Sequence, residues 1–338
     1  MIITHRNGSY EIKFRALSDA LANLPEDGRV ITDELVAASL SLGERISIPV
    51  FGLPPGEGSK SIEAFEKCLN WLANSGASRK TSVIALGGGV IGDLAGYLAA
   101  SYMRGVPFIQ VPTTLLAQVD SSVGGKVGID LAAGKNLAGA FYPPSRVEIC
   151  PDALSTLPGR QIRNGMAEVL KYGFIMDAPL LELCGPSDFD RNSGELVRRC
   201  IDLKRQVVEA DEFETNGTRA TLNFGHTIGH ALEQMTGYGP LLHGEAISIG
   251  MIAEARLGER LEITEGGTSD QVAGFLRAWD LPDHHPLLAE AGPMLAAMRR
   301  DKKAHGGRLA FSLLTKIGEC KLVTDLHDQD VVEALKST

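Results

Sequence analysis

The sequence has no long apolar run, little cysteine and no excess of positive charge. No segment approaches the roughly 18 apolar residues of a membrane-spanning helix, and the opening MIITHRNGSYEIKF lacks the basic and apolar regions of a secretory signal. The five cysteines are scattered and never spaced as CxxC, which argues against a disulfide framework or a zinc knuckle. We therefore expect a cytoplasmic protein with reduced thiols and no membrane partner.

The charge balance excludes a further class of partner. The chain has 33 basic and 42 acidic residues, a formal charge of −9, whereas nucleic acids are bound chiefly through an excess of lysine and arginine. We expect no nucleic-acid partner, although an anionic small substrate remains possible where basic residues gather. The length of 338 residues and the 44% apolar content favour a globular, enzyme-sized protein of two domains.

The pattern of the sequence changes near residue 152. Before it, short runs rich in valine and isoleucine alternate with helical stretches: RVITD, RISIPVFG, TSVIALGG, PFIQVPTT, KVGID and RVEIC. This alternation predicts a Rossmann-like, mainly parallel α/β domain over residues 1–152. After it, patterns such as QIRNGMAEVLKYGFIM predict a mostly α-helical domain over residues 153–338, with a small late hairpin in GRLAFSLLTKIGECKL.

A glycine-rich turn lies between one of these strands and a helix. Gly87, Gly89 and Gly92 satisfy GxGxxG, the pattern in which a tight turn and the amides of a helix N-terminus hold a pyrophosphate. A turn that binds nothing explains this motif equally well. The acidic residue expected about 20 residues later is absent, because the next strand runs into PTT. Other groups that a ribose could use are Asp33, Glu57 and Lys60.

Three of the eight histidines lie within NFGHTIGHALEQMTGYGPLLHGEA. The i, i+4 spacing places His226 and His230 on one helical face, and the glycine-rich turn can bring His243 back against them. We favour a metal or catalytic site over three unrelated histidines. Glu168 is a candidate for the carboxylate that would complete a zinc site, and the alternative is a helix-surface ion pair with Lys171.

Basic residues gather in glycine-rich, otherwise uncharged segments of this acidic chain. Solvated surface lysines explain any one of them, but together with two asparagines and an aspartate they suit a pocket for a phosphate and several hydroxyls. The residues are Arg104, Asp120, Lys126, Lys135, Asn136, Lys171, Lys204, Arg219, Asn223, Lys302 and Lys303.

Six segments, in this order and spacing, resemble the 3-dehydroquinate synthases of the sugar-phosphate cyclase superfamily: GGGVIGDLAGYLAASYMRG, VPTTLLAQVDSSVGGKVGID, GKNLAGAFYPP, GMAEVLKYG, TLNFGHTIGHALE and LHGEA. The resemblance implies a homodimer with bound NAD and one divalent ion, zinc or cobalt. The implied reaction converts 3-deoxy-D-arabino-heptulosonate 7-phosphate to 3-dehydroquinate and phosphate in the shikimate pathway. Transient oxidation at C5 by NAD, β-elimination of phosphate, re-reduction, ring opening and aldol closure are its steps.

The same resemblance implies roles for individual residues. Glu168, His226 and His243 become the metal ligands, which leaves His230 near the reacting carbon and the phosphate. The NAD site would comprise Asp33, Glu57, Lys60, Gly88, Gly89, Val90, Gly92, Asp93, Thr113, Thr114, Lys135 and Thr156. Catalysis would involve His230, Lys126, Asp120, Lys171 and Asn223, and substrate binding would involve Arg104, Asn136, Lys204, Arg219 and one or both of Lys302 and Lys303. One departure from the family pattern is a segment, DEFETNGTR, that is one residue longer.

Three alternatives remain open. A metal-dependent, glycerol-type polyol dehydrogenase would share the fold type, the glycine turn and the histidine-bearing helix. A sister sugar-phosphate cyclase would act on another sugar phosphate, although Lys126, Asn136, Asn223 and His230 favour the dehydroquinate branch. A non-catalytic binding protein would have no need to keep every one of these residues.

Overall fold

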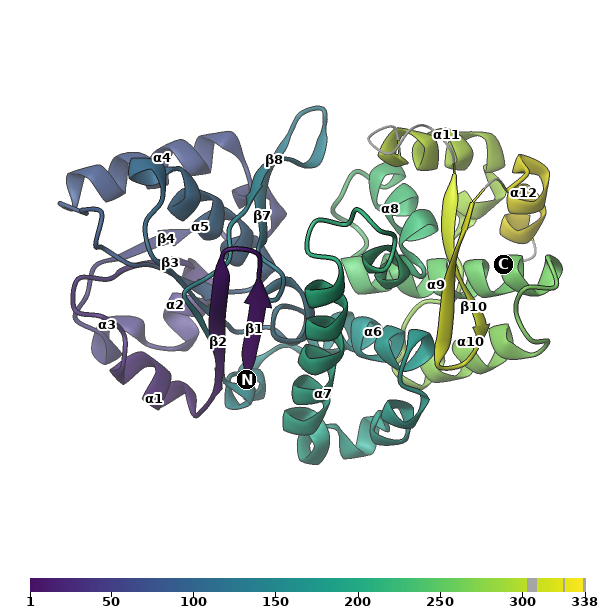
Figure 1. Cartoon of the computed structure of the whole chain (residues 1–338), viewed down its shortest axis with the longest axis horizontal. Helices are drawn as coiled ribbons and strands as arrows, with labels where there is room; N and C mark the ends of the chain where they lie inside the picture. Colours follow the sequence, from purple (N-terminus) through teal and green to yellow (C-terminus); the bar gives the residue numbers. More distant parts are fainter. Residues whose placement is uncertain (303–308, 325, 337–338) are drawn as a thin grey trace. The chain divides into compact units, whose positions relative to one another are not determined.

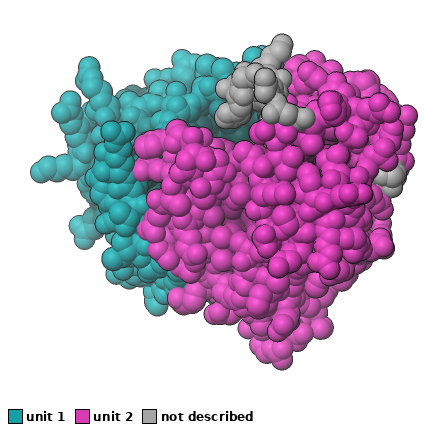
Figure 2. Space-filling model, turned by 45° about the vertical axis from the view of Figure 1, so that its right-hand side comes forward, with its two compact units in different colours: residues 1–162 teal, residues 163–338 magenta. Residues whose placement is uncertain are grey.

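The computed structural model describes residues 1–302, 309–324 and 326–336, and the chain divides into two compact units, residues 1–162 and 163–338 (Figure 2). The predicted boundary at residue 152 lies earlier than this division. The reason is a 3₁₀ segment, η4 (Pro151–Thr156), that packs within the first unit. The Leu17 amide donates to the Asp152 carboxylate at 3.0 and 3.1 Å, so this connecting segment belongs to the first core.

The first unit is built on a seven-stranded sheet with the order β1-β2-β9-β6-β5-β3-β4. Its strands are β1 (Ile2–His5), β2 (Gly8–Phe14), β3 (Arg29–Asp33), β4 (Val50–Leu53), β5 (Val83–Gly87), β6 (Phe108–Pro112) and β9 (Arg146–Ile149). Neighbouring strands run parallel, except in the N-terminal hairpin of β1 and β2. The predicted mainly parallel sheet is confirmed.

Helices cover both faces of this sheet. They are α1 (Leu17–Ala22), α2 (Glu34–Ser39), α3 (Leu42–Arg45), α4 (Ile62–Asn74) and α5 (Gly89–Ser101). Ile31 and Ala85 pack with residues of α4 and α5, whereas their neighbours Val30 and Ile84 pack on the opposite face with residues of α1 and α3. Successive side chains of a strand point to opposite faces, so the apolar residues of these strands supply two cores at once.

One expected strand of the parallel sheet lies elsewhere. KVGID forms β7 (Lys126–Leu131), which pairs antiparallel with β8 (Gly134–Phe141) in a separate hairpin. A short turn joins the two, and such a turn permits antiparallel pairing, whereas a parallel pair needs a long crossover. A Cβ on Gly139 would lie 2.3 Å from the Val127 carbonyl oxygen. Glycine at this position therefore permits the close backbone contact of the hairpin.

The second unit is mostly helical, as predicted (Figure 1). Its helices are α6 (Gly159–Ile175), which begins just before the division, α7 (Phe189–Ala210), α8 (His226–Met235), α9 (His243–Arg260), α10 (Thr268–Ala278), α11 (Ala291–Lys302) and α12 (Asp328–Lys336). The predicted late hairpin is present as β10 (Ala310–Lys316) and β11 (Glu319–Thr324). Helix α9 is buried along most of its length and packs against α8, α10, α12 and β10. In the described part of the chain, no helix combines the length and the apolar character needed to cross a membrane.

Helices α8 and α9 pack antiparallel at very short range. A Cβ on Gly250 would lie 2.0 Å from the Gly225 carbonyl oxygen, and one on Gly229 would lie 3.0 Å from the backbone of Ile247. Gly225 also has φ +82°, a left-handed conformation that side chains rarely adopt. These glycines let the two backbones approach, and they thereby set the distance between the side chains that the two helices present.

Replacing Gly250 with alanine tests this packing. The new methyl group would force α8 and α9 apart, so we expect Gly250→Ala to lower the free energy of unfolding by about 1–3 kcal/mol in urea titrations. Gly274→Ala is the matched control, because Gly274 is an exposed glycine inside α10 with no atom near its virtual Cβ. That control should gain about 0.5–1 kcal/mol from helix propensity. A Gly250→Ala protein as stable as the wild type would contradict the packing argument.

Candidate active site

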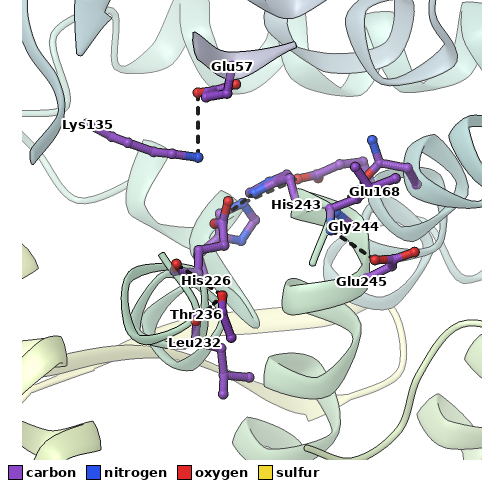
Figure 3. A network of polar contacts seen from close by, with 12 residues as sticks. Glu57, Lys135, Glu168, His226, Leu232, Thr236, His243, Gly244 and Glu245 are labelled. Carbon is purple, nitrogen blue, oxygen red and sulfur yellow. Dashed lines mark hydrogen bonds and ion pairs between the residues drawn. The ribbon is translucent and has the colours of Figure 1, made fainter. Parts of the chain in front are cut away.

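Three side chains from three helices converge in the second unit. Glu168 comes from α6, His226 from α8 and His243 from α9 (Figure 3). The Nε2 atoms of both histidines lie 3.2 Å from Oε1 of Glu168. Two ligands held tetrahedrally about 2.0–2.1 Å from one zinc ion are about 3.3 Å apart, so the spacing fits a single metal ion. Two imidazoles and a carboxylate are also the donor set of catalytic zinc sites that keep an open position.

The structure separates the two histidines that share one helical face. His226 contacts Glu168, whereas His230 groups with Glu233 and His243. The rings of His226 and His230 meet edge to face with their centroids 5.3 Å apart. The i, i+4 pair that spacing alone suggested is therefore not the arrangement around Glu168, and the histidine that joins His226 there is His243.

The carboxylate of Glu168 is buried beside a buried cation. Lys171 Nζ lies 2.5 Å from Glu168 Oε2, and the two side chains are 2% and 1% exposed. Burial alone would raise the pKa of Glu168, but Lys171 and the two histidines outweigh it and hold that pKa well below its usual value. Burial and Lys171 lower the pKa of His226 to about 4, against the attraction of Glu168. A solvated helix-surface pair is thus excluded for Glu168 and Lys171.

A second carboxylate, missed by the sequence analysis, orients His243. Glu233 Oε2 lies 3.3 Å from His243 Nδ1, and an acceptor at Nδ1 leaves Nε2 for a metal ion. Burial lowers the pKa of His243, but Glu233 and Glu168 outweigh it and raise the pKa to about 10. Two facts could have pointed to Glu233 in the sequence. A histidine that binds metal generally needs such an acceptor, and Glu233 lies one helical turn after His230.

The start of α9 is tied to α6 by a residue that the sequence analysis also missed. The Gly244 amide donates to Asn164 Oδ1 at 2.6 Å, and a Cβ on Gly244 would lie 2.1 Å from the Asn164 carbonyl oxygen. The Leu242 amide donates to Glu245 Oε2 at 2.9 Å. Since Asn164 lies one turn before Glu168, the same stretch of α6 fixes the carboxylate and the helix end that presents His243.

Three more polar residues of the second unit that the family resemblance implies, Lys204, Arg219 and Asn223, lie on the two elements that precede α8. Lys204 is buried in α7, and Arg219 is buried in the 3₁₀ segment η7 (Arg219–Asn223). Arg219 Nη1 donates to the Glu212 carbonyl oxygen at 2.6 Å, and Asn223 Nδ2 donates to Glu214 Oε1 at 3.4 Å. Lys303 and the side chain of Lys302 lie outside the described residues.

The longer DEFETNGTR segment is a turn organised by one carboxylate. Asp211 accepts hydrogen bonds from the amides of Thr215, Asn216 and Arg219. Burial would raise the pKa of Asp211, but these backbone donors outweigh it and lower that pKa. These hydrogen bonds hold the segment in a turn that anchors the backbone of Arg219.

Residues implied for NAD follow the carboxyl ends of adjacent parallel strands in the first unit. Asp33 ends β3, while Gly88 follows β5 and Thr113 follows β6. Glu57 lies in the 3₁₀ segment η1 (Glu57–Ser59) after β4, and Thr156 ends η4 after β9. This is the edge at which open α/β sheets bind ligands. The Asp33 carboxylate also accepts the Val36 amide at 2.9 Å and so caps α2.

The glycine turn forms a cradle that side chains would fill. A Cβ on Gly88 would lie 3.1 Å from the Thr114 side chain, and one on Gly89 would lie 3.0 Å from Ser121 Oγ. Gly88 is the N-cap of α5 and supplies no capping side chain, so first-turn amides at Gly89, Val90 and beyond can receive an anion. The geometry fits a pyrophosphate.

Polar side chains of the β7–β8 hairpin join those implied for NAD. Lys60 Nζ lies 2.5 Å from both Asp93 Oδ2 and Asn136 Oδ1, and Lys135 pairs with Glu57 at 3.5 Å (Figure 3). Burial lowers the pKa of Lys60, but Asp93 outweighs it and raises that pKa. The family resemblance implies Asn136 for substrate binding, but its side chain contacts Lys60, one of the residues implied for NAD.

The remaining implied residues of the first unit lie on three distinct segments. Asp120 belongs to a π-helical turn, Ala117–Ser121, and Lys126 is the exposed first residue of β7. Arg104 has φ +67° and follows Met103 at φ +48°. Two consecutive left-handed residues other than glycine are strained, and such strain concentrates at functional sites.

Comparison with known proteins gives these features a family. The models of the 3-dehydroquinate synthase N-terminal and C-terminal parts match residues 50–164 and 165–304. A 3-dehydroquinate synthase of Opitutus terrae is 46% identical over 97% of this chain and 95% of its own. The chain belongs to the 3-dehydroquinate synthase family. The predicted family and activity are thereby confirmed.

Solved structures of sister cyclases share the whole fold. ValA, a 2-epi-5-epi-valiolone synthase from Streptomyces hygroscopicus subsp. jinggangensis 5008 with NAD⁺ and Zn²⁺ bound, matches with a TM-score of 0.89 at 25% identity, over 100% of this chain and 98% of its own. A 2-deoxy-scyllo-inosose synthase complexed with carbaglucose-6-phosphate, NAD⁺ and Co²⁺ matches with a TM-score of 0.87 at 24% identity, over 100% and 99%. The predicted fold class is confirmed, and the predicted cofactors are those of these relatives.

The raised pKa of His243 predicts how metal binding depends on pH. In the metal-free protein His243 is protonated at neutral pH, because its pKa of about 10 lies well above 7, and a metal ion requires its neutral form. Zinc binding at pH 7.5 should therefore release about one proton. The apparent affinity should rise with pH, by about tenfold for each pH unit while His243 is mostly protonated. Calorimetry in buffers of different ionisation enthalpy measures the number of protons released on zinc binding.

A matched variant tests whether the released proton comes from His243. Glu233→Gln removes the main charge that raises the pKa of His243, so it should release less than one proton under the same conditions. Zinc binding without proton release in the wild type would contradict the assignment of a protonated His243.

Proposed function

We propose that this chain converts 3-deoxy-D-arabino-heptulosonate 7-phosphate to 3-dehydroquinate and phosphate, with Glu168, His226 and His243 holding the divalent ion. The observation that carries the proposal is the convergence of both Nε2 atoms on one buried carboxylate oxygen at 3.2 Å. When bound, NAD would oxidise and then re-reduce one substrate carbon, and the ion would polarise the neighbouring oxygens. A homodimer, as the family resemblance implies, is part of the proposal.

The chain's own residues fix the protonation states that metal binding needs at two of the three proposed ligands. Lys171 and the two histidines keep Glu168 ionised, and burial keeps His226 neutral near pH 7. Glu233 accepts from His243 Nδ1 and directs Nε2 towards Glu168. The ligand atoms are thereby set before a metal ion arrives, which reduces the cost of reorganisation on binding.

In the first unit, we assign the pyrophosphate to the amides at the start of α5. Gly88 and Gly89 leave the space that a side chain would otherwise take, and the helix N-terminus favours the negative charge. Lys60 and Asp93 hold each other at the same edge, where Asp33, Glu57, Val90, Gly92, Thr113, Thr114, Lys135 and Thr156 are the further residues proposed for NAD.

We assign His230 to the chemistry of the leaving phosphate. Its ring lies 5.3 Å from that of His226 and 5.9 Å from that of His243, centroid to centroid, close to the ligands yet outside the contacts to Glu168. An imidazole there can orient an anion and exchange a proton with it. Further proposed substrate contacts are Arg104, Asp120, Lys126, Asn136, Lys171, Lys204, Arg219, Asn223, Lys302 and Lys303.

A phosphate-release assay tests the reaction. With the heptulosonate phosphate and NAD, we expect inorganic phosphate to appear with no net rise in NADH absorbance, because the hydride returns to the same carbon. Glu168→Gln, which removes the charge at the centre of the proposed metal site, is the control for contaminating phosphatase. NADH accumulation on glycerol would instead indicate a polyol dehydrogenase, and turnover of sedoheptulose 7-phosphate would indicate a sister cyclase.

Two histidine variants separate the proposed roles. His243→Ala should lose both the bound metal and turnover, since it removes one of three ligands. His230→Ala should retain the metal while turnover falls by about 10²–10⁴, the usual contribution of a positioned acid or base. Elemental analysis and the phosphate assay measure the two effects. Full metal content in His243→Ala, or full activity in His230→Ala, would exclude the corresponding role.

A further inference from the structure

A buried carboxylate on α9, the helix that also presents His243, holds the helix that presents His226. Glu254 of α9 is 0% exposed. Its Oε2 accepts the Gly225 amide at 2.7 Å and its Oε1 accepts the Ile228 amide at 3.2 Å. Both oxygens thus engage the first turn of α8, on either side of His226.

Helix α8 cannot supply this cap from its own sequence. Its N-cap is Gly225, which has no side chain to accept the free amides of the first turn. Another residue type is also excluded there, because a Cβ on Gly225 would lie 2.4 Å from the Met251 side chain and 2.8 Å from the Ile247 carbonyl oxygen. The cap must therefore come from a neighbouring helix.

The same helix pair is joined at its other end by a second carboxylate. Glu233 of α8 contacts His243 at the start of α9, and Glu254 of α9 contacts Gly225 at the start of α8. Between these two contacts the helices are in close backbone approach at Gly229 and Gly250. Sliding or tilting α8 against α9 would break the Glu254 hydrogen bonds and would move Nε2 of His226 away from Glu168.

We propose that Glu254 is a positioning residue for the metal site: by capping α8 from α9, its carboxylate fixes His226 in register with His243. The inference rests on the proposed metal-binding role of Glu168, His226 and His243. It assigns to Glu254 an effect on metal affinity beyond its effect on stability, although Glu254 itself lies in neither group of potential metal-ligating side chains found among the described residues.

The chain provides a matched control for this proposal. Glu259, on the same helix, caps α10 through the Ser269 amide and Oγ at 2.8 and 2.7 Å. Helix α10 presents none of the proposed ligands. Both glutamates are α9 carboxylates that cap another helix, so Glu254→Gln and Glu259→Gln make the same chemical change. Only Glu254 caps the helix that presents His226.

The experiment measures zinc affinity and local protection on the full-length chain after metal removal. Zinc is titrated against a competing chelator, and amide hydrogen exchange is followed for the first turn of α8 without metal. We expect Glu254→Gln to weaken zinc binding by about 10- to 100-fold, because its amide group turns a donor towards one backbone N–H, and to speed exchange at Gly225 and Ile228. Glu259→Gln should bind zinc within about twofold of the wild type.

The outcomes of this experiment test the positioning role and the metal site separately. Wild-type affinity in Glu254→Gln, or an equal loss in Glu259→Gln, would overturn the positioning role. If Glu254→Gln does not fold, Glu254→Asp provides the comparison, because it keeps the charge with a shorter reach. Faster exchange at Gly225 and Ile228 with unchanged zinc affinity in that variant would overturn the proposal too. Failure of the wild type to bind zinc, or binding unaffected by Glu168→Gln, would instead refute the metal site itself.

Discussion

The buried negative charge of Glu168 is the constraint on which the second unit depends. A carboxylate in an apolar interior is costly unless cations or donors surround it, and here Lys171 and two imidazoles from separate helices do so. Lys171 lies on the same helix as Glu168, but each histidine comes from another helix. The helices α6, α8 and α9 must therefore meet at one point. The glycines between α8 and α9 and the side-chain cap from Asn164 meet that requirement.

Much of the fold followed from periodicity, because short strands rich in valine and isoleucine and long helical patterns are local properties of the chain. RVITD and TSVIALGG contain the predicted strands β3 and β5, and the late hairpin formed as expected. The pairing of KVGID did not follow, since a strand's composition does not identify its partner. The boundary expected at residue 152 also precedes the division at residue 162, because the packing of Asp152 on Leu17 is a tertiary contact.

The candidate site, like the fold, was predicted from the sequence only in part. Residue types and their order were enough to single out Glu168, the three histidines and the glycine turn, and the family resemblance then distinguished His230 from His243. Glu233, Asn164 and Glu254 were missed because each acts through a hydrogen bond to another element, and hydrophobic patterns do not reveal such partners. All three lie within helices, where a charged or polar side chain is normally solvated.

The helical hairpin formed by α8 and α9 has a consequence for how the protein is made. His226, Glu233, His243 and Glu254 all lie in residues 226–260, so most of the contacts among them close short loops, which cost little chain entropy and form early. Glu168 is synthesised before any of them, and it gains its two histidine partners only when the hairpin docks on α6. Assembly of the site therefore waits for the emergence of α9 during synthesis, and the last partner to reach the carboxylate is an imidazole.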